Sequence, residues 1–245
     1  MEYPKDHFSY SAYAKFNECP RRWYFDYVKY PEEKVEIPAF ALGIAYHEAL
    51  AEMYRGKTLE DCKTTYADYL KGKNVSPQQH EVLDKCLDYY YSNIYPQFRS
   101  KVDKVEEKLS VDIEGIGVKF EYIIDLKTVD GILVDHKTSG ARAPSLNNSD
   151  QLDIYSYAYL VKNGRLPREV HYHVAYKSPK KNQVEIKSKM PKLSEVLKTV
   201  SNVRSCFNMI ENDNLPARRG YHCRYCPFAA ECDNLIISSE GSNNI

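Results

Sequence analysis

Apolar residues in the first hundred positions recur with the 3.6-residue period of an α-helix. In the clearest run they are Leu42, Ala45, Ala49, Leu50 and Met53. We therefore expect three helices, over residues 39–54, 59–70 and 77–98. Before them, Ser9 can cap a short helix, and Pro20 can open another that continues to Val28.

The apolar period changes to two in the middle of the chain, as in a β-strand. Residues 104–118 alternate, and a tight Asp130-Gly131 turn joins two runs typical of strands, residues 119–129 and 131–136. The remaining expected elements are a helix over residues 147–161, strands over 169–176 and 183–187, and a helix over 193–210. The strand–strand–helix–strand order predicts an α/β core with helices added before and after it.

Composition is that of a globular protein of 245 residues, of which 43% are hydrophobic. No run approaches the roughly 20 apolar residues of a membrane helix, and residues 1–6 lead into no apolar signal segment, so we expect a cytoplasmic location. The 34 basic and 34 acidic residues cancel, which argues against binding nucleic acid by bulk charge alone. Local binding and cleavage remain possible.

Acidic and basic residues mark the end of the central hairpin. Asp135 and Lys137 are two apart on one expected strand, so their side chains project from the same face, and Asp125 can approach them across the hairpin. Two carboxylates and a backbone carbonyl, such as that of His136, suit Mg²⁺ or Mn²⁺. Lys137 would place a positive charge beside an attacking water. By itself, this spacing also fits an ordinary hairpin with a surface ion pair.

Two further elements carry polar residues at informative spacings. Gln151 and Tyr155 are four residues apart and share one face of the expected helix. Upstream, the run Gly43-Ile-Ala-Tyr-His47 places a histidine on an earlier helix. Taken alone, His47 also fits a partly buried structural histidine.

Seven cysteines, an odd number, argue against a disulfide framework. Cys223, Cys226 and Cys232 form a C-x₂-C-x₅-C pattern typical of a metal site, which needs a fourth ligand. Cys19, in a Cys-Pro-Arg-Arg-aromatic context, is the best candidate. Four thiolates suit Zn²⁺ as well as an iron–sulfur cluster.

Together these motifs resemble the RecB-like branch of the PD-(D/E)XK nucleases, and the cysteines resemble its iron–sulfur subgroup. That subgroup includes AddB-type recombination nucleases, CRISPR-associated adaptation nucleases and exonuclease V. The resemblance runs from Cys19 to Cys232 and implies a restriction-endonuclease-like core, a mixed sheet flanked by helices. It implies a [4Fe–4S] cluster on Cys19, Cys223, Cys226 and Cys232.

For the active site, the resemblance implies that His47, Asp125 and Asp135 are metal ligands and that Lys137 is catalytic. Gln151 and Tyr155 would orient the site or hold DNA. The chain would then be a single nuclease domain over residues 1–245. Its parts would be a helical region (8–103), a nuclease core (104–211) and a cluster segment (212–235).

The expected reaction is Mg²⁺- or Mn²⁺-dependent hydrolysis of DNA, and relatives in the subgroup favour exonuclease action on single-stranded ends. Candidate DNA contacts are Tyr155, Arg21, Arg22, Arg218 and Arg219. Two alternatives remain: an inactive DNA-binding module, or a subunit of a recombination or CRISPR-adaptation complex. The sequence has no helicase P-loop, so a helicase or integrase would be a separate partner.

Overall fold

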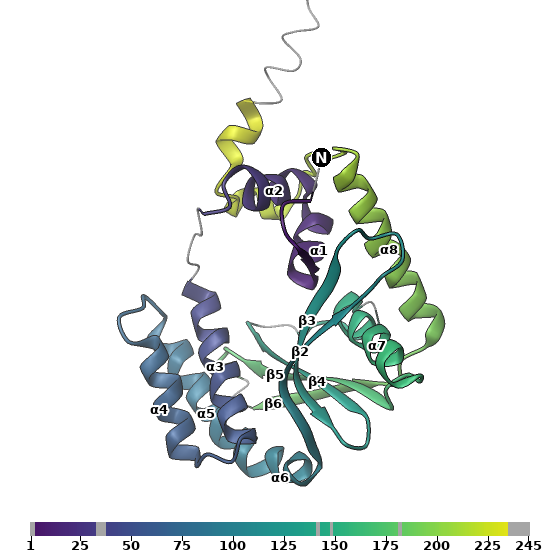
Figure 1. Ribbon diagram of the computed structural model, residues 1–245. Helices are drawn as coiled ribbons and strands as arrows, with labels where there is room; N and C mark the ends of the chain where they lie inside the picture. Colours follow the sequence, from purple (N-terminus) through teal and green to yellow (C-terminus); the bar gives the residue numbers. More distant parts are fainter. Residues whose placement is uncertain (1–2, 33–37, 141–142, 148, 181–182, 235–245) are drawn as a thin grey trace, which may run out of the picture. The chain divides into compact units, whose positions relative to one another are not determined.

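The computed structural model describes residues 3–32, 38–140, 143–147, 149–180 and 183–234 (Figure 1). The helices are α1 (Tyr10–Glu18), α2 (Pro20–Tyr24), η1 (Phe25–Lys29, a π-helix), α3 (Pro38–Tyr54), α4 (Leu59–Leu70), α5 (Pro77–Asn93), α6 (Tyr95–Phe98), η2 (Arg99–Lys101), α7 (Asp150–Asn163), α8 (Leu193–Glu211) and η3 (Tyr221–Tyr225). The strands are β1 (His7–Ser9), β2 (Val102–Val111), β3 (Lys119–Thr128), β4 (Ile132–Ser139), β5 (Glu169–Tyr176) and β6 (Val184–Lys189).

Helix ends follow local capping chemistry. The Ser9 hydroxyl accepts a hydrogen bond from the Ala12 amide at the start of α1, which confirms the predicted cap. Thr58 and Asp61 form a reciprocal capping box at the start of α4. At its C-terminus, α7 ends on Gly164 in the left-handed conformation, with φ of 70°.

The single helix expected over residues 77–98 is wrong, because the structure divides it. Helix α5 ends at Asn93, Ile94 leaves regular geometry, and a short helix α6 follows. Pro96 explains the break. It has no amide N–H to donate to the carbonyl four residues earlier, and its ring crowds that carbonyl.

The sheet is mixed, as expected, with the order β1-β3-β4-β5-β6 and with β2 paired to β3. Strands β3 and β4 form the antiparallel hairpin, and Gly131 takes a positive φ of 83° in its turn. Helix α7 connects β4 to the parallel strand β5, and β6 returns antiparallel. The sequence did not predict β1, whose three residues pair in parallel with the start of β3 and are too few to show a period.

The chain forms two compact units. One comprises Glu36–Ser110 and Tyr122–Thr199, and the other comprises Met1–Val35, Val111–Glu121 and Val200–Ile245. We call them the catalytic-motif unit and the cysteine unit. The division expected from the sequence, into a helical region (8–103), a nuclease core (104–211) and a cluster segment (212–235), stays a prediction.

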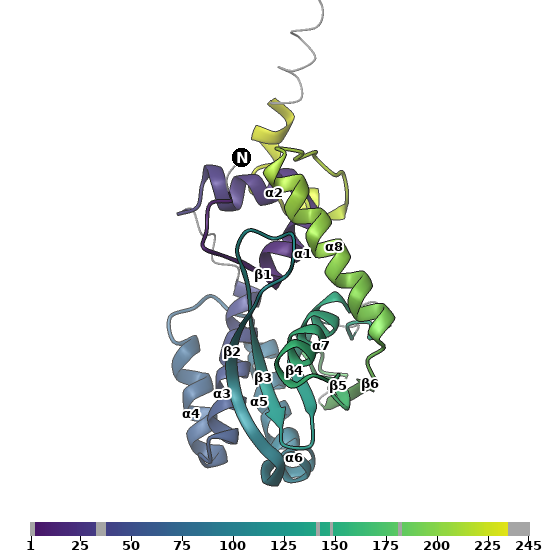
Figure 2. The ribbon, with the colours of Figure 1, turned by 45° about the vertical axis from the view of Figure 1, so that its right-hand side comes forward.

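In the catalytic-motif unit, α3 and α5 contact β4 and β5, and α7 contacts β5 from the other side of the sheet (Figures 1 and 2). Its core joins α3, α4 and α5 to the sheet through apolar side chains such as Leu50, Leu83, Leu126 and Val134. In the cysteine unit, Trp23 packs against Phe16, and Phe8 packs against Phe120 and Phe207. Among the described residues, no helix is both long enough and apolar enough to span a membrane.

Candidate active site

The end of the β3–β4 hairpin brings the predicted acidic and basic residues together. The Lys137 Nζ lies 2.6 Å from the Asp135 Oδ2, which confirms that the two side chains share a face of β4. From β3, the Asp125 Oδ2 accepts a hydrogen bond of 2.6 Å from the backbone amide of His136. Asp125 is therefore hydrogen-bonded to the residue that follows Asp135 in β4, which holds the two aspartates close to each other.

Helix α7 supplies the next pair of side chains. The Gln151 Nε2 donates to the Asp135 Oδ1 at 2.7 Å and lies 2.8 Å from the Tyr155 hydroxyl. That hydroxyl lies 3.3 Å from the same carboxylate oxygen. Gln151, Tyr155 and Asp135 are all buried. Since Gln151 and Tyr155 are one helical turn apart, the expected shared face is confirmed, and it is directed at Asp135.

Helix α3 brings His47 to the other aspartate. The His47 Nδ1 lies 3.4 Å from the Asp125 Oδ2. One turn earlier, a Cβ atom at Gly43 would lie only 3.2 Å from the Thr138 Oγ1 of β4. A side chain at residue 43 would therefore crowd the Thr138 hydroxyl, and one of the two would have to shift by a few tenths of an ångström. The glycine permits the close approach that places His47 beside the hairpin.

The buried Asp135 carboxylate and the half-buried Asp125 carboxylate have opposite electrostatic environments. Burial raises the pKa of Asp135 to about 6, although Lys137 opposes this change. Burial also acts on Asp125, but His47 and the His136 amide outweigh it and lower the pKa of Asp125 to about 2. The site thus contains one carboxylate whose charge is well compensated and one whose charge burial disfavours.

An unpredicted network of aromatic and histidine side chains surrounds the His136 imidazole. The ring is buried and lies 5.5 Å from both the Tyr90 and His173 ring centroids. The Tyr90 hydroxyl forms hydrogen bonds of 2.8 Å with the Tyr54 hydroxyl and with the His173 Nδ1. These residues come from α3, α5, β4 and β5, so no single sequence spacing could have revealed the network.

A divalent cation fits the oxygen atoms at the hairpin. Among the described residues, no three His, Cys, Asp or Glu side chains are arranged to hold an ion by themselves. The Asp135 Oδ2 is buried and has only the ion pair with Lys137. A cation between Asp125 and Asp135 would relieve the cost of a buried charge, and a backbone carbonyl could complete an oxygen-rich set.

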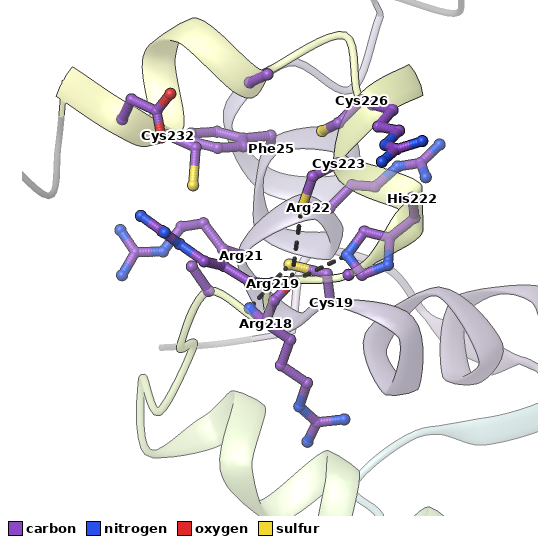
Figure 3. A pocket seen from close by; sticks show the side chains of 15 residues that line it. Cys19, Arg21, Arg22, Phe25, Arg218, Arg219, His222, Cys223, Cys226 and Cys232 are labelled. Atoms are coloured by element: carbon purple, nitrogen blue, oxygen red, sulfur yellow. Dashed lines mark hydrogen bonds between the residues drawn. The ribbon is translucent and has the colours of Figure 1, made fainter.

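In the cysteine unit, the four predicted cluster cysteines line one cavity of about 480 Å³ (Figure 3). All four thiols are free. The Arg218 amide lies 3.5 Å from the Cys19 Sγ, which links the N-terminal cysteine to the C-terminal segment. Within the described part of the chain the four sulfur atoms are not arranged as a group that could hold a metal ion, although thiolates are the ligands that an iron–sulfur cluster or Zn²⁺ takes.

The remaining cysteines lie elsewhere in the protein's interior. Cys62, Cys86 and Cys206 are buried, and none of them lines the cavity. Burial raises the pKa of Cys62 and of Cys86 to about 11. Thiols with a raised pKa stay protonated near neutral pH, in keeping with a packing role for Cys62 and Cys86.

The four arginines predicted to contact DNA all line the same cavity, but three have protein partners. Arg21 donates to the Leu215 carbonyl, Arg22 pairs with Glu18, and Arg218 donates to the Asn17 carbonyl. Arg219 is exposed and forms no hydrogen bond or ion pair within the described part of the chain. Of the four, Arg219 is the most available for a ligand.

The fold and the hairpin chemistry agree with the family comparison. Residues 7–233 match the family profile of the PD-(D/E)XK nuclease superfamily. The chain therefore belongs to this superfamily, whose nucleases use divalent metal ions such as Mg²⁺.

Solved structures show the same fold at low sequence identity. A crystal structure described as a "Putative exonuclease" from Eubacterium rectale is 12% identical, with a TM-score of 0.63 over 92% of this chain and 88% of that chain. A structure described as SSO0001 is 17% identical, with a TM-score of 0.49 over 93% of this chain and 86% of that chain. A comparison with curated proteins found no match.

Proposed function

We propose that this protein is a metal-dependent DNA exonuclease that acts on single-stranded ends. The observation that carries the proposal is the convergence of Asp125, Asp135 and Lys137 at one hairpin end, together with Gln151 and Tyr155. An ordinary surface ion pair would not need a buried carboxylate held by a buried amide and hydroxyl. The described geometry therefore favours the catalytic interpretation of the D-x-K spacing over the hairpin alternative.

Each residue has a role that follows from its contacts. Asp125, Asp135, His47 and the His136 carbonyl would hold Mg²⁺ or Mn²⁺, which when bound supplies Lewis acidity toward the phosphate and the attacking water. Lys137 stabilises the negative charge that develops on the phosphate. Gln151 and Tyr155 fix the Asp135 carboxylate, so that it does not have to reorganise during the reaction.

We propose that a [4Fe–4S] cluster binds Cys19, Cys223, Cys226 and Cys232. Their shared cavity supports the proposal. Cys19 and the other three ligands are about 200 positions apart, so the cluster would close a long loop and its binding free energy would stabilise the folded chain. Zn²⁺ is the alternative occupant.

Colour and metal content distinguish the two occupants. Protein purified without oxygen should absorb in the visible region and contain iron. Cys19→Ala should be colourless and less stable, whereas Cys62→Ala, which removes a buried thiol outside the cavity, should keep its iron. Stoichiometric zinc in a colourless parent protein would replace the cluster proposal with a zinc site.

The nuclease proposal is tested with end-labelled single-stranded and double-stranded DNA, with and without Mg²⁺ or Mn²⁺. Cleavage should require the ion, favour single strands, and fall at least about 100-fold in Lys137→Ala. Because this variant leaves the buried Asp135 carboxylate without its ion pair, circular dichroism must show that it is folded under the assay conditions. Cleavage by the variant at the parent rate would contradict the proposal.

Partner dependence is the second candidate. If the parent binds DNA but does not cut it, the chain is an inactive module or needs a helicase or integrase subunit. Adding candidate partners to the same assay separates these cases, because only a partner-dependent nuclease would regain Lys137-dependent cleavage.

A further inference from the structure

Two exposed tyrosines lie on the short 3-10 helix η3 of the cysteine unit. Tyr221 is 69% exposed and Tyr225 is 71% exposed. Their ring centroids are 5.6 Å apart, and their hydroxyls are 3.1 Å apart. The Arg224 guanidinium lies 5.3 Å from the Tyr221 ring centroid. We call Tyr221, Arg224 and Tyr225 the tyrosine–arginine surface.

Such exposure is unusual for large aromatic side chains, since most tyrosines bury their rings and leave only the hydroxyl near water. The contacts of these two rings are with each other and with an arginine. The two rings meet edge to face at an interplanar angle of 61°, and the Arg224 guanidinium lies over one face of the Tyr221 ring. The ring surface that remains exposed is available to a partner.

The charge of the surrounding segment indicates the class of partner. Between Asp213 and Glu231 the sequence has three arginines and no acidic residue, although basic and acidic residues balance over the whole chain. Arg219 and Arg224 are both exposed. A local excess of guanidinium groups beside aromatic rings matches the chemistry of a polyanion that also carries π-faces, which is a nucleic acid.

We propose that the tyrosine–arginine surface is a stacking platform for the unpaired bases of single-stranded DNA. The two rings would stack on bases, and Arg224 and Arg219 would contact the phosphates between them. Duplex bases already stack on one another, so the platform would favour single strands. The choice of DNA over a protein partner rests on the proposed nuclease function.

The test measures binding in the full chain and does not depend on cleavage. Lys137→Ala serves as the background, so that a fluorescently labelled oligothymidine stays intact, and anisotropy reports its dissociation constant. Tyr221→Ala and Tyr225→Ala should each weaken binding roughly tenfold, because they remove a stacking ring. Tyr221→Phe and Tyr225→Phe keep the rings and should bind like the background protein. Met190→Ala, which trims a 74% exposed side chain in the other unit, should also leave binding unchanged.

A second measurement covers the case in which an alanine variant loses metal or stability. An oligonucleotide containing 5-iodouridine, cross-linked by light to the background protein, should label Tyr221 or Tyr225 in peptide mapping. Cross-links confined to other segments would overturn the proposal. Unchanged oligothymidine affinity in both alanine variants would overturn it as well.

The two proposals fail in different ways. If the parent chain cuts DNA but the tyrosine variants bind oligothymidine normally, only the platform is wrong. If the parent never cuts DNA while the tyrosine variants lose binding, the platform stands and the nuclease proposal fails.

Discussion

The opposite environments of the two aspartates predict opposite effects of removing their charges. Asp135→Asn should stabilise the protein in the absence of divalent ions near neutral pH, although it should abolish activity. The reason is that the folded protein must hold the Asp135 carboxylate in a buried position, where the cost of burial outweighs the compensation of its charge by Lys137 and His47. An amide at this position can still accept the hydrogen bond from Gln151.

The magnitude follows from the pKa of Asp135, which burial raises from 3.8 to about 6. An acid whose pKa is raised by folding stabilises the folded state below its unfolded pKa, and this stability is lost as pH rises through the folded pKa. For Asp135 the loss falls between about pH 4 and pH 6 and amounts to about 3 kcal/mol. Asp135→Asn avoids this loss because it cannot ionise.

Asp125→Asn is the matched control. Burial opposes ionisation there too, but His47 and the His136 amide lower the pKa of Asp125 from 3.8 to about 2. Its charge stabilises the fold above about pH 4, and that stability is lost as pH falls toward pH 2. Neutralising Asp125 should therefore cost about 2 kcal/mol near neutral pH.

Urea unfolding of the parent and both variants, followed by circular dichroism in metal-free buffer, measures these differences. At about pH 7, Asp135→Asn should be more stable than the parent and Asp125→Asn less stable. The advantage of Asp135→Asn should vanish near pH 4. Adding Mg²⁺ should stabilise only the parent, because the proposed ion would bind both carboxylates of the folded state. Shifts of the same sign at neutral pH would refute the electrostatic reasoning.

Three further predictions concern the residues that hold the site in place. Gln151→Leu removes a hydrogen bond to a carboxylate and should raise the Mn²⁺ concentration for half-maximal cleavage about 10- to 100-fold; an unchanged midpoint would exclude the orienting role. Gly43→Ala gains helix propensity but brings a methyl group within 3.2 Å of the Thr138 Oγ1, so in chemical denaturation it should be more favourable in a Thr138→Ala background than in the parent; equal effects in both backgrounds would exclude the crowding. Tyr90→Phe leaves the buried His173 nitrogen without its donor or acceptor and should cost about 2 kcal/mol in the same assay; a cost near zero would mean that the network is not structural.

The sequence predicted local features well. The cap at Ser9 and the hairpin turn at Gly131 both formed as expected, because each depends on chemistry within a few residues. The shared faces of Asp135 with Lys137, and of Gln151 with Tyr155, also formed as expected. These features follow from the period of two in a strand and of 3.6 in a helix.

Contacts between segments that are distant in the sequence could be predicted only in part. The family resemblance placed His47 near the aspartates, but the sequence contained no sign that Gly43 would lie so close to the Thr138 side chain. It also offered no sign of the Tyr54–Tyr90–His173 network beneath His136. The sequence also did not predict that Tyr221 and Tyr225 are exposed, since tyrosine occurs both in cores and on surfaces.

The sequence by itself therefore determined which residues share a strand or helix face and which chemical groups the chain can offer. Only the tertiary structure decided that Asp125 is stabilised as an anion while Asp135 is not. The physical reason is that a hydrophobic pattern defines the buried face of each element but not its neighbour across the core. Burial and charge compensation, which set a pKa, depend on that neighbour.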